Sequence, residues 1–240
     1  IMKEIAHQLI AWYHQNKRDL PWRNTQDPYK IWLSEIILQQ TRVEQGLQYY
    51  QIFIKSFPDI HKLAKAPDRK VFKLWEGLGY YSRCRNLLAA ARQVMQQFEG
   101  RFPNNYNDIL SLKGVGPYTA AAIASFGFGL PHAVVDGNVI RVLARFFLEY
   151  APFDTLAGKK IFQAMADFVL DKSHPAAFNQ ANKDFGATIC KPALPQCGIC
   201  PLHTKCQAFT RCTKGMKIAL ARHTPVFKLY CQLNCRFSFT

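Results

Sequence analysis

Apolar positions along the chain recur every three or four residues, which is the spacing that lets one face of an α-helix pack on a core. The first such stretch contains Ile5, Leu9, Trp12 and Tyr13 and ends before Pro21. The same spacing, interrupted by turn-forming Gly and Pro, predicts further helices over residues 29–45, 47–56, 68–75, 82–98, 106–111, 117–127, 136–147, 156–170 and 175–187. No run alternates apolar and polar residues as a strand would, so the sequence predicts an all-α fold.

The net charge of the chain indicates what kind of partner it binds. The 240 residues carry a formal net charge of +15, and such an excess of Lys and Arg attracts polyanions, so we expect a nucleic acid partner. No long basic amphipathic helix favours a membrane surface, and the N-terminus does not look like a signal peptide. The longest nearly apolar run, residues 120–130, is too short to span a bilayer. We therefore expect a cytoplasmic protein with no membrane partner.

Four cysteines fall close together, in the pattern Cys190-x6-Cys197-x2-Cys200-x5-Cys206. In a reducing compartment such a group indicates metal more often than disulfides. Four thiolates in one loop can enclose a tetrahedral ion or a cubane iron–sulfur cluster. Zinc is the alternative, although zinc modules typically have two close cysteine pairs separated by a longer spacer. Either group is expected to be structural, and the remaining cysteines are expected to take no part.

A glycine hairpin is expected between two predicted helices, at Lys113-Gly114-Val115-Gly116. Its two glycines permit a tight turn that exposes backbone N–H groups, and the next helix presents its positive N-terminus to the same place. A phosphate fits such a site without base contacts, so the hairpin would bind DNA of any sequence. An ordinary corner between two helices is the alternative.

Further motifs accompany the hairpin and the cysteines, in the order Leu20 to Arg23, Trp32 to Thr41, Gly77 to Arg83 and Val135 to Val139. Together these segments resemble the MutY family of adenine DNA glycosylases, within the helix-hairpin-helix superfamily. The match covers about residues 5–208. The cysteine spacing alone also fits the related endonuclease III.

The resemblance implies two helical domains of the helix-hairpin-helix DNA glycosylase type. One is a six-helix barrel of about residues 21–130, and the other joins residues 1–20 to 131–208 and carries a [4Fe–4S] cluster in a C-terminal loop. Residues 209–240 would form a weakly ordered basic tail. The implied ligands of the cluster are Cys190, Cys197, Cys200 and Cys206. The implied partner is double-stranded DNA with adenine opposite 8-oxoguanine or guanine, bound by a monomer at the bacterial nucleoid, and the adenine is flipped into a pocket.

Two carboxylates carry the implied chemistry. Glu35 matches the family's catalytic acid, and its helical neighbours Ile31 and Trp32 form an apolar wall that disfavours ionisation, so we expect it to protonate N7 of adenine. Asp136 matches the carboxylate that stabilises the oxocarbenium-like charge, with assistance from Tyr118. Considered without the resemblance, Glu35 fits a buried, hydrogen-bonded carboxyl and Asp136 fits a helix N-cap.

Tyr118 also predicts an absence of strand cleavage, because endonuclease III-like enzymes have a Schiff-base lysine at this position. Asn138 is expected to orient the water or the acid. The resemblance assigns a wedge in the DNA stack to Gln40 and Tyr80, with Gln39 beside them, and a phosphate contact to Lys113. It assigns the adenine pocket to Trp22, Arg23 and Gln180. The alternatives are a core indole for Trp22 and a surface cation for Arg23.

The chain departs from the family in three places. Lys113 replaces the proline of the hairpin, and Lys183 stands where apolar residues are usual. Family members continue into a domain that inspects 8-oxoguanine, whereas 34 residues follow Cys206 here, so we expect a reduced preference between 8-oxoguanine and guanine. The competing hypotheses are a thymine glycosylase acting on T·G mismatches and a DNA-binding remnant without activity. Glu35 favours adenine, because only a purine offers N7.

Overall fold

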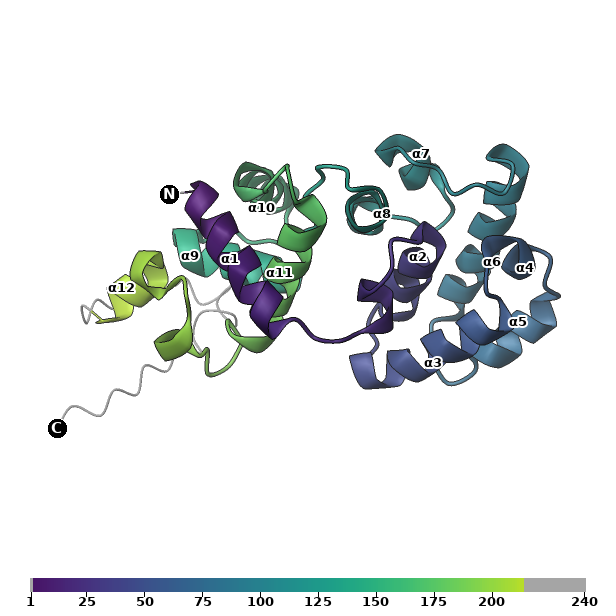
Figure 1. Cartoon of the computed structure of the whole chain (residues 1–240), viewed down its shortest axis with the longest axis horizontal. Coiled ribbons are helices and arrows are strands. Elements are labelled where there is room, and N and C mark those ends of the chain that lie inside the picture. Colours follow the sequence, from purple (N-terminus) through teal and green to yellow (C-terminus); the bar gives the residue numbers. More distant parts are fainter. Residues whose placement is uncertain (1, 214–240) are drawn as a thin grey trace. The chain divides into compact units, whose positions relative to one another are not determined.

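The structure is a computed structural model that describes residues 2–213 (Figure 1). These residues form twelve α-helices and three short 3-10 helices and contain no strand, which confirms the expected all-α class. The chain divides into two compact units. Within the described residues, one combines residues 2–18 with residues 133–213, and the other consists of residues 19–132. No helix in the described part of the chain is long and apolar enough to cross a membrane.

The unit of residues 19–132 is built around one central helix. Its elements are η1 (Pro21–Arg23), α2 (Pro28–Ile37), α3 (Val43–Ser56), α4 (Ile60–Ala64), α5 (Asp68–Trp75), α6 (Tyr81–Gln97), α7 (Tyr106–Ser111) and α8 (Pro117–Phe128). In α2, every residue from Ile31 to Ile37 is buried, as is typical of an interior helix. This helix packs against α3, α6 and α8. Glu35 is therefore buried because it lies on this interior helix, and no loop is needed to cover it.

The helix predicted over residues 29–45 is two helices in the structure. Because α2 ends at Ile37 and α3 begins at Val43, the prediction was wrong at this point. Between them the chain turns at Gln40, whose φ of +57° is left-handed and cannot continue a helix. The apolar spacing runs on through Leu38, so periodicity alone does not reveal the break.

The short helix α4 was not predicted. Five residues give too few repeats for a periodic pattern. A local signal was present, because the Asp59 carboxylate accepts a hydrogen bond from the backbone N–H of Lys62 and caps the helix.

The other unit consists of α1 (Met2–Asn16), α9 (Gly137–Phe147), α10 (Leu156–Val169), α11 (Pro175–Thr188), η2 (Cys197–Ile199), η3 (His203–Lys205) and α12 (Gln207–Thr213). Its core forms where α11 packs between α1 and α9. The basic tail was predicted to begin at residue 209, but α12 continues to Thr213, so residues 209–213 are helical. The rest of the predicted tail lies outside the described residues.

Gly158 provides a test of packing in this unit. It lies in the first turn of α10, and a Cβ atom there would lie 1.9 Å from the carbonyl oxygen of Pro152. We expect Gly158→Ala to force a backbone shift and to lower the free energy of unfolding by about 1–3 kcal/mol. Thermal unfolding should show this as a lower midpoint, by roughly 2–4 °C per kcal/mol. Gly137→Ala is the control, because a Cβ there meets nothing within 4 Å. Equal midpoints for the two variants would contradict this packing.

Candidate functional site

Glu35 and Tyr118 meet where α2 packs on α8. Glu35 is 8% exposed, and Ile31 and Trp32 on the preceding turn are each 1% exposed. The Tyr118 hydroxyl donates a hydrogen bond to Oε2 of Glu35, with 2.9 Å between the oxygens. Tyr118 was expected to assist Asp136, and this bond to Glu35 was not anticipated. A phenol therefore fixes one oxygen of a buried carboxyl, which is an arrangement suited to holding an acid in one orientation.

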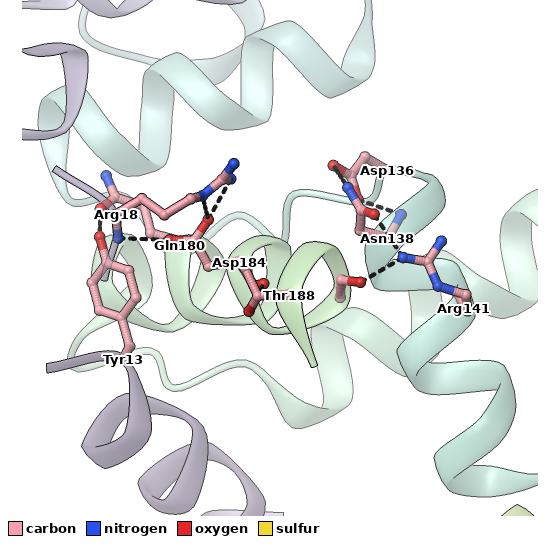
Figure 2. Close-up of polar contacts among 9 residues, drawn as sticks. Tyr13, Arg18, Asp136, Asn138, Arg141, Gln180, Asp184 and Thr188 are labelled. Carbon is pink, nitrogen blue, oxygen red and sulfur yellow. Dashed lines mark hydrogen bonds and ion pairs between the residues drawn. The ribbon is translucent and has the colours of Figure 1, made fainter. Parts of the chain in front are cut away.

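Asp136 caps the N-terminus of α9 (Figure 2). Its Oδ1 accepts hydrogen bonds from the backbone N–H groups of Asn138, at 2.8 Å, and Val139, at 2.9 Å. Its Oδ2 has a longer contact of 3.4 Å with the Asn138 side-chain amide. The N-cap alternative thus describes what Oδ1 does. The same bonds fix the plane of the carboxylate, so capping and a role for the negative charge are compatible.

Asn138 is held by a buried arginine that the sequence analysis did not identify. Nη2 of Arg141 donates to Oδ1 of Asn138 at 2.7 Å and to the carbonyl oxygen of Gly186 at 2.6 Å (Figure 2). Nε of Arg141 donates to the carbonyl oxygen of Cys190 at 2.7 Å. Arg141 is 4% exposed, and burial lowers the pKa of its guanidinium. The available signal was a cation on the apolar face of an amphipathic helix.

Gln180 faces α1 within the same unit. The Tyr13 hydroxyl donates to Oε1 of Gln180 at 2.5 Å. Asp184 lies one turn further along α11 and forms an ion pair with Arg18, also at 2.5 Å (Figure 2). Asp184 is fully buried, whereas Lys183 beside it is half-buried. These bonds tie the end of α1 to the helix that carries Gln180, so its amide has a fixed orientation.

Trp22 and Arg23 belong to η1. Trp22 is 8% exposed and packs edge-on against the ring of Tyr50, with 5.2 Å between the ring centroids. This placement matches the core alternative for Trp22. Arg23 is half-buried.

One open groove is lined by Gln39, Gln40, Tyr80, Ser82 and Arg83. Gln40 is exposed, and Tyr80 is 64% exposed. The structure therefore brings together three residues that the sequence placed in two separate motifs, at the end of α2 and before the start of α6.

The predicted hairpin forms between α7 and α8. Gly114 has a φ of +76°, and a Cβ there would lie 2.6 Å from Cβ of Asn86, so the turn needs glycine. Lys113 is exposed, and its backbone N–H donates to the side chain of Gln93. Val115 is buried, and Gly116 is the N-cap residue of α8. The hairpin thus ends at the helix that carries Tyr118.

The four clustered cysteines line one pocket with apolar neighbours from α9 and α11. All four are half-buried, and burial raises the pKa of Cys200 to about 12 and that of Cys206 to about 11. Nη1 of Arg145 donates to the sulfur of Cys190 at 3.4 Å. Among the described residues, no group of three or more His, Cys, Asp or Glu side chains lies close enough to hold a single metal ion. Of the other cysteines, Cys84 and Cys212 do not line the pocket, and positions 231 and 235 lie outside the described residues.

Comparisons with known proteins place this geometry in a family. The model of the HhH-GPD superfamily base excision DNA repair protein matches residues 33–155. The adenine DNA glycosylase of Buchnera aphidicola subsp. Baizongia pistaciae is 42% identical over 84% of this chain and 57% of its own length. The adenine DNA glycosylase of Homo sapiens is 41% identical over 88% of this chain and 40% of its own length. The chain thus spans about half the length of the curated relatives it matches.

Solved structures agree with these relatives. A thermostable thymine-DNA glycosylase superposes with a TM-score of 0.80 at 31% identity, over 88% of this chain and 97% of that one. Endonuclease III in a non-covalent DNA complex has a TM-score of 0.72 at 19% identity, over 89% of this chain and 99% of that one, which shows a shared fold. The resemblance read from the motifs is confirmed at the level of the superfamily. The chain belongs to the HhH-GPD superfamily of base excision DNA repair proteins.

Proposed function

We propose that this chain is a monofunctional adenine DNA glycosylase, which hydrolyses the N-glycosidic bond of adenine opposite 8-oxoguanine or guanine. The observation that carries the proposal is the buried carboxyl of Glu35, fixed by the Tyr118 hydroxyl at 2.9 Å. Relatives about 40% identical to the chain are adenine DNA glycosylases, which supports adenine as the base that is removed. We further propose that the protein acts as a monomer on double-stranded DNA in the cytoplasm.

Glu35 supplies the proton in this mechanism. Its Oε2 accepts the Tyr118 hydrogen bond, and the carboxyl delivers a proton to N7 of an extruded adenine. Protonation turns the base into a leaving group. The C1′–N9 bond then breaks, its electron pair stays with adenine, and the sugar becomes oxocarbenium-like. Water adds to C1′ and releases a proton, so the products are free adenine and an abasic site.

Asp136 supplies negative charge to the same intermediate. Because its carboxylate is already fixed by two backbone N–H groups, it stabilises developing positive charge without reorganising. Asn138 lies beside it and is oriented by Arg141.

Tyr118 limits the reaction to base removal. A strand-cleaving glycosylase needs an amine that attacks C1′ and forms a Schiff base, and a phenol cannot do so. The abasic strand should therefore stay intact until it is treated with alkali.

One assay tests the activity. The purified protein is incubated with duplexes carrying adenine opposite 8-oxoguanine, guanine or cytosine, and thymine opposite guanine, and each sample is divided for treatment with or without alkali. We expect strand breaks after alkali at adenine opposite 8-oxoguanine and guanine. Breaks at thymine opposite guanine would contradict the proposal and would indicate a glycosylase that acts on T·G mismatches. Binding with a steep salt dependence and no breaks would indicate a DNA-binding module without chemistry.

We also propose that the cysteine pocket holds a [4Fe–4S] cluster. The donors fit this group, because four half-buried sulfurs line one apolar pocket and a guanidinium lies against one of them. Cys190, Cys197, Cys200 and Cys206 would hold it. When bound, the cluster would be structural and would hold the loop from Cys190 to Cys206 in place.

Replacement of one pocket cysteine should remove the cluster. We expect Cys200→Ser to lose bound iron and sulfide and to unfold at a lower temperature, because metal binding free energy is folding free energy for such loops. Cys212→Ser is the matched control and should keep full iron content, since Cys212 does not line the pocket. Iron and sulfide analysis and visible absorption measure both. Stoichiometric zinc without visible absorption would contradict the cluster.

A further inference from the structure

Arg83, on the first turn of α6, binds the C-terminal end of α2. Its Nη1 donates to the carbonyl oxygens of Ile36, at 3.1 Å, Ile37, at 3.2 Å, and Gln39. Its Nη2 donates to the carbonyl oxygen of Leu78 at 3.2 Å. The last carbonyls of a helix lack partners within the helix, and a cation is favourable there. One guanidinium thus joins the end of α2 to the loop that precedes α6.

Two residues with unusual backbone conformations adjoin these carbonyls. Gln40 has a φ of +57° and Tyr80 a φ of +46°, in the left-handed region that non-glycine residues adopt only at a cost. Gln40 directly follows Gln39, whose carbonyl Arg83 binds. Tyr80 lies two residues after Leu78, and its ring centroid is 5.3 Å from the guanidinium carbon. Such strain persists only where the surroundings impose it, and Arg83 contacts both places.

Trp75 contacts both Arg83 and the loop that precedes Tyr80. The guanidinium carbon of Arg83 lies 5.4 Å from the ring centroid of Trp75, which is fully buried. Nε1 of Trp75 donates to the carbonyl oxygen of Gly79 at 2.9 Å, so the loop before Tyr80 is anchored from a second side. Burial lowers the pKa of Arg83. Packing gives no reason for the strain at Gln40 and Tyr80, because both side chains are exposed in the groove.

We infer that Arg83 is a positioning residue for DNA recognition, which fixes Gln40 and Tyr80 together in strained conformations so that they are presented ready-made to an opened base stack. The inference rests on the proposed function. Arg83 itself uses Nη1 and Nη2 for main-chain carbonyls and acts through the two side chains. Preorganised groups bind with a smaller ordering cost, and a wedge gains contacts only where bases have separated. Arg83 should therefore increase the affinity for DNA with an open base stack more than the affinity for intact duplex.

A first test uses the protein without DNA. Arg83→Lys keeps the charge but loses the planar set of donors. Arg92→Lys is the matched control, because Arg92 lies on the same helix and donates to the carbonyls of Ala64 and Ala66, away from the groove. Hydrogen exchange should become about tenfold faster at residues 37–41 and 78–82 in Arg83→Lys and stay unchanged there in Arg92→Lys. Equal exchange at these residues in both variants would overturn the inference.

A second test measures binding selectivity. The readout is the ratio of Kd for an intact duplex to Kd for the same duplex with a tetrahydrofuran abasic analogue. Arg83→Lys should lower this ratio about tenfold, as should Tyr80→Ala, and the double variant should lose no more than either single variant, because residues acting as a unit are non-additive. Arg92→Lys should keep the ratio within about twofold. An unchanged ratio in Arg83→Lys, or additive losses, would overturn the inference.

The Gln40→Ala variant and the unchanged protein provide two further measurements. Gln40→Ala changes an exposed side chain and should lower the same ratio, and its failure to do so would overturn the inference even if Arg83→Lys does not fold. The duplex assay of the unchanged protein tests the proposed function separately. If that protein releases no adenine but Arg83→Lys still loses selectivity, the proposed activity fails and the positioning role stands. If adenine is released and Arg83→Lys behaves like Arg92→Lys, only the positioning role fails.

Discussion

Glu35→Gln is expected to lower the rate of adenine release by about 10²–10⁴-fold, the usual contribution of a positioned general acid. Glutamine has nearly the same shape, and its side-chain oxygen still accepts the Tyr118 hydrogen bond seen at 2.9 Å. What the variant lacks is the proton that Glu35 would transfer to N7. The fold and DNA affinity should change little, because the substitution preserves packing around a side chain that is 8% exposed.

The measurement is a single-turnover rate with the protein in excess over a duplex that carries adenine opposite 8-oxoguanine. Glu44→Gln on α3 is the matched control, since it makes the same chemical change at an exposed position and should keep the full rate. The thermal midpoints of both variants show whether the fold is intact. Equal rates for Glu35→Gln and the unchanged protein would remove Glu35 from the mechanism and return it to the buried, hydrogen-bonded alternative.

Much of the fold follows from local pattern, and the exceptions have local physical causes. Apolar spacing located α6 and α11, because each has one face in the core and is long enough for the pattern to repeat. It failed after Ile37, where the apolar pattern continues but Gln40 adopts a left-handed conformation. A backbone dihedral of this kind leaves no periodic trace. The cause lies in Arg83, whose guanidinium holds this turn from a helix more than 40 residues later.

In the candidate site, too, the sequence identified individual residues but not the contacts between distant parts of the chain. Glu35 and Asp136 were found through motifs, and the cap at Asp136 was also readable from local sequence. The bond between Tyr118 and Glu35 joins residues 83 positions apart, and no spacing rule predicts such a pair. Arg141 was missed because an arginine within a helix is usually solvated. Its acceptors include the carbonyl oxygen of Cys190, 49 residues away, which only the folded chain places beside α9.

Asp136→Asn is expected to lower the rate of adenine release by about 10²–10³-fold while leaving the fold intact, the loss typical when one preorganised electrostatic group is removed. Asparagine is as good an N-cap as aspartate, so its side-chain oxygen should still accept the N–H groups of Asn138 and Val139 that Oδ1 now binds. The substitution therefore separates capping from charge. Asp136→Ala removes both, and should also lower the free energy of unfolding by about 0.5–2 kcal/mol.

Asp27→Asn is the matched control, because Asp27 caps α2 in the same way, accepting a hydrogen bond from the backbone N–H of Tyr29 at 3.0 Å. That variant should keep the full rate. Single-turnover rates and thermal midpoints of the three variants then distinguish the two roles of Asp136. If Asp136→Asn is as fast as Asp27→Asn and only Asp136→Ala is impaired, the carboxylate is a helix cap and its charge does no chemistry. A slow Asp136→Asn with an unchanged midpoint requires the negative charge itself, since every backbone contact of the cap is then still in place.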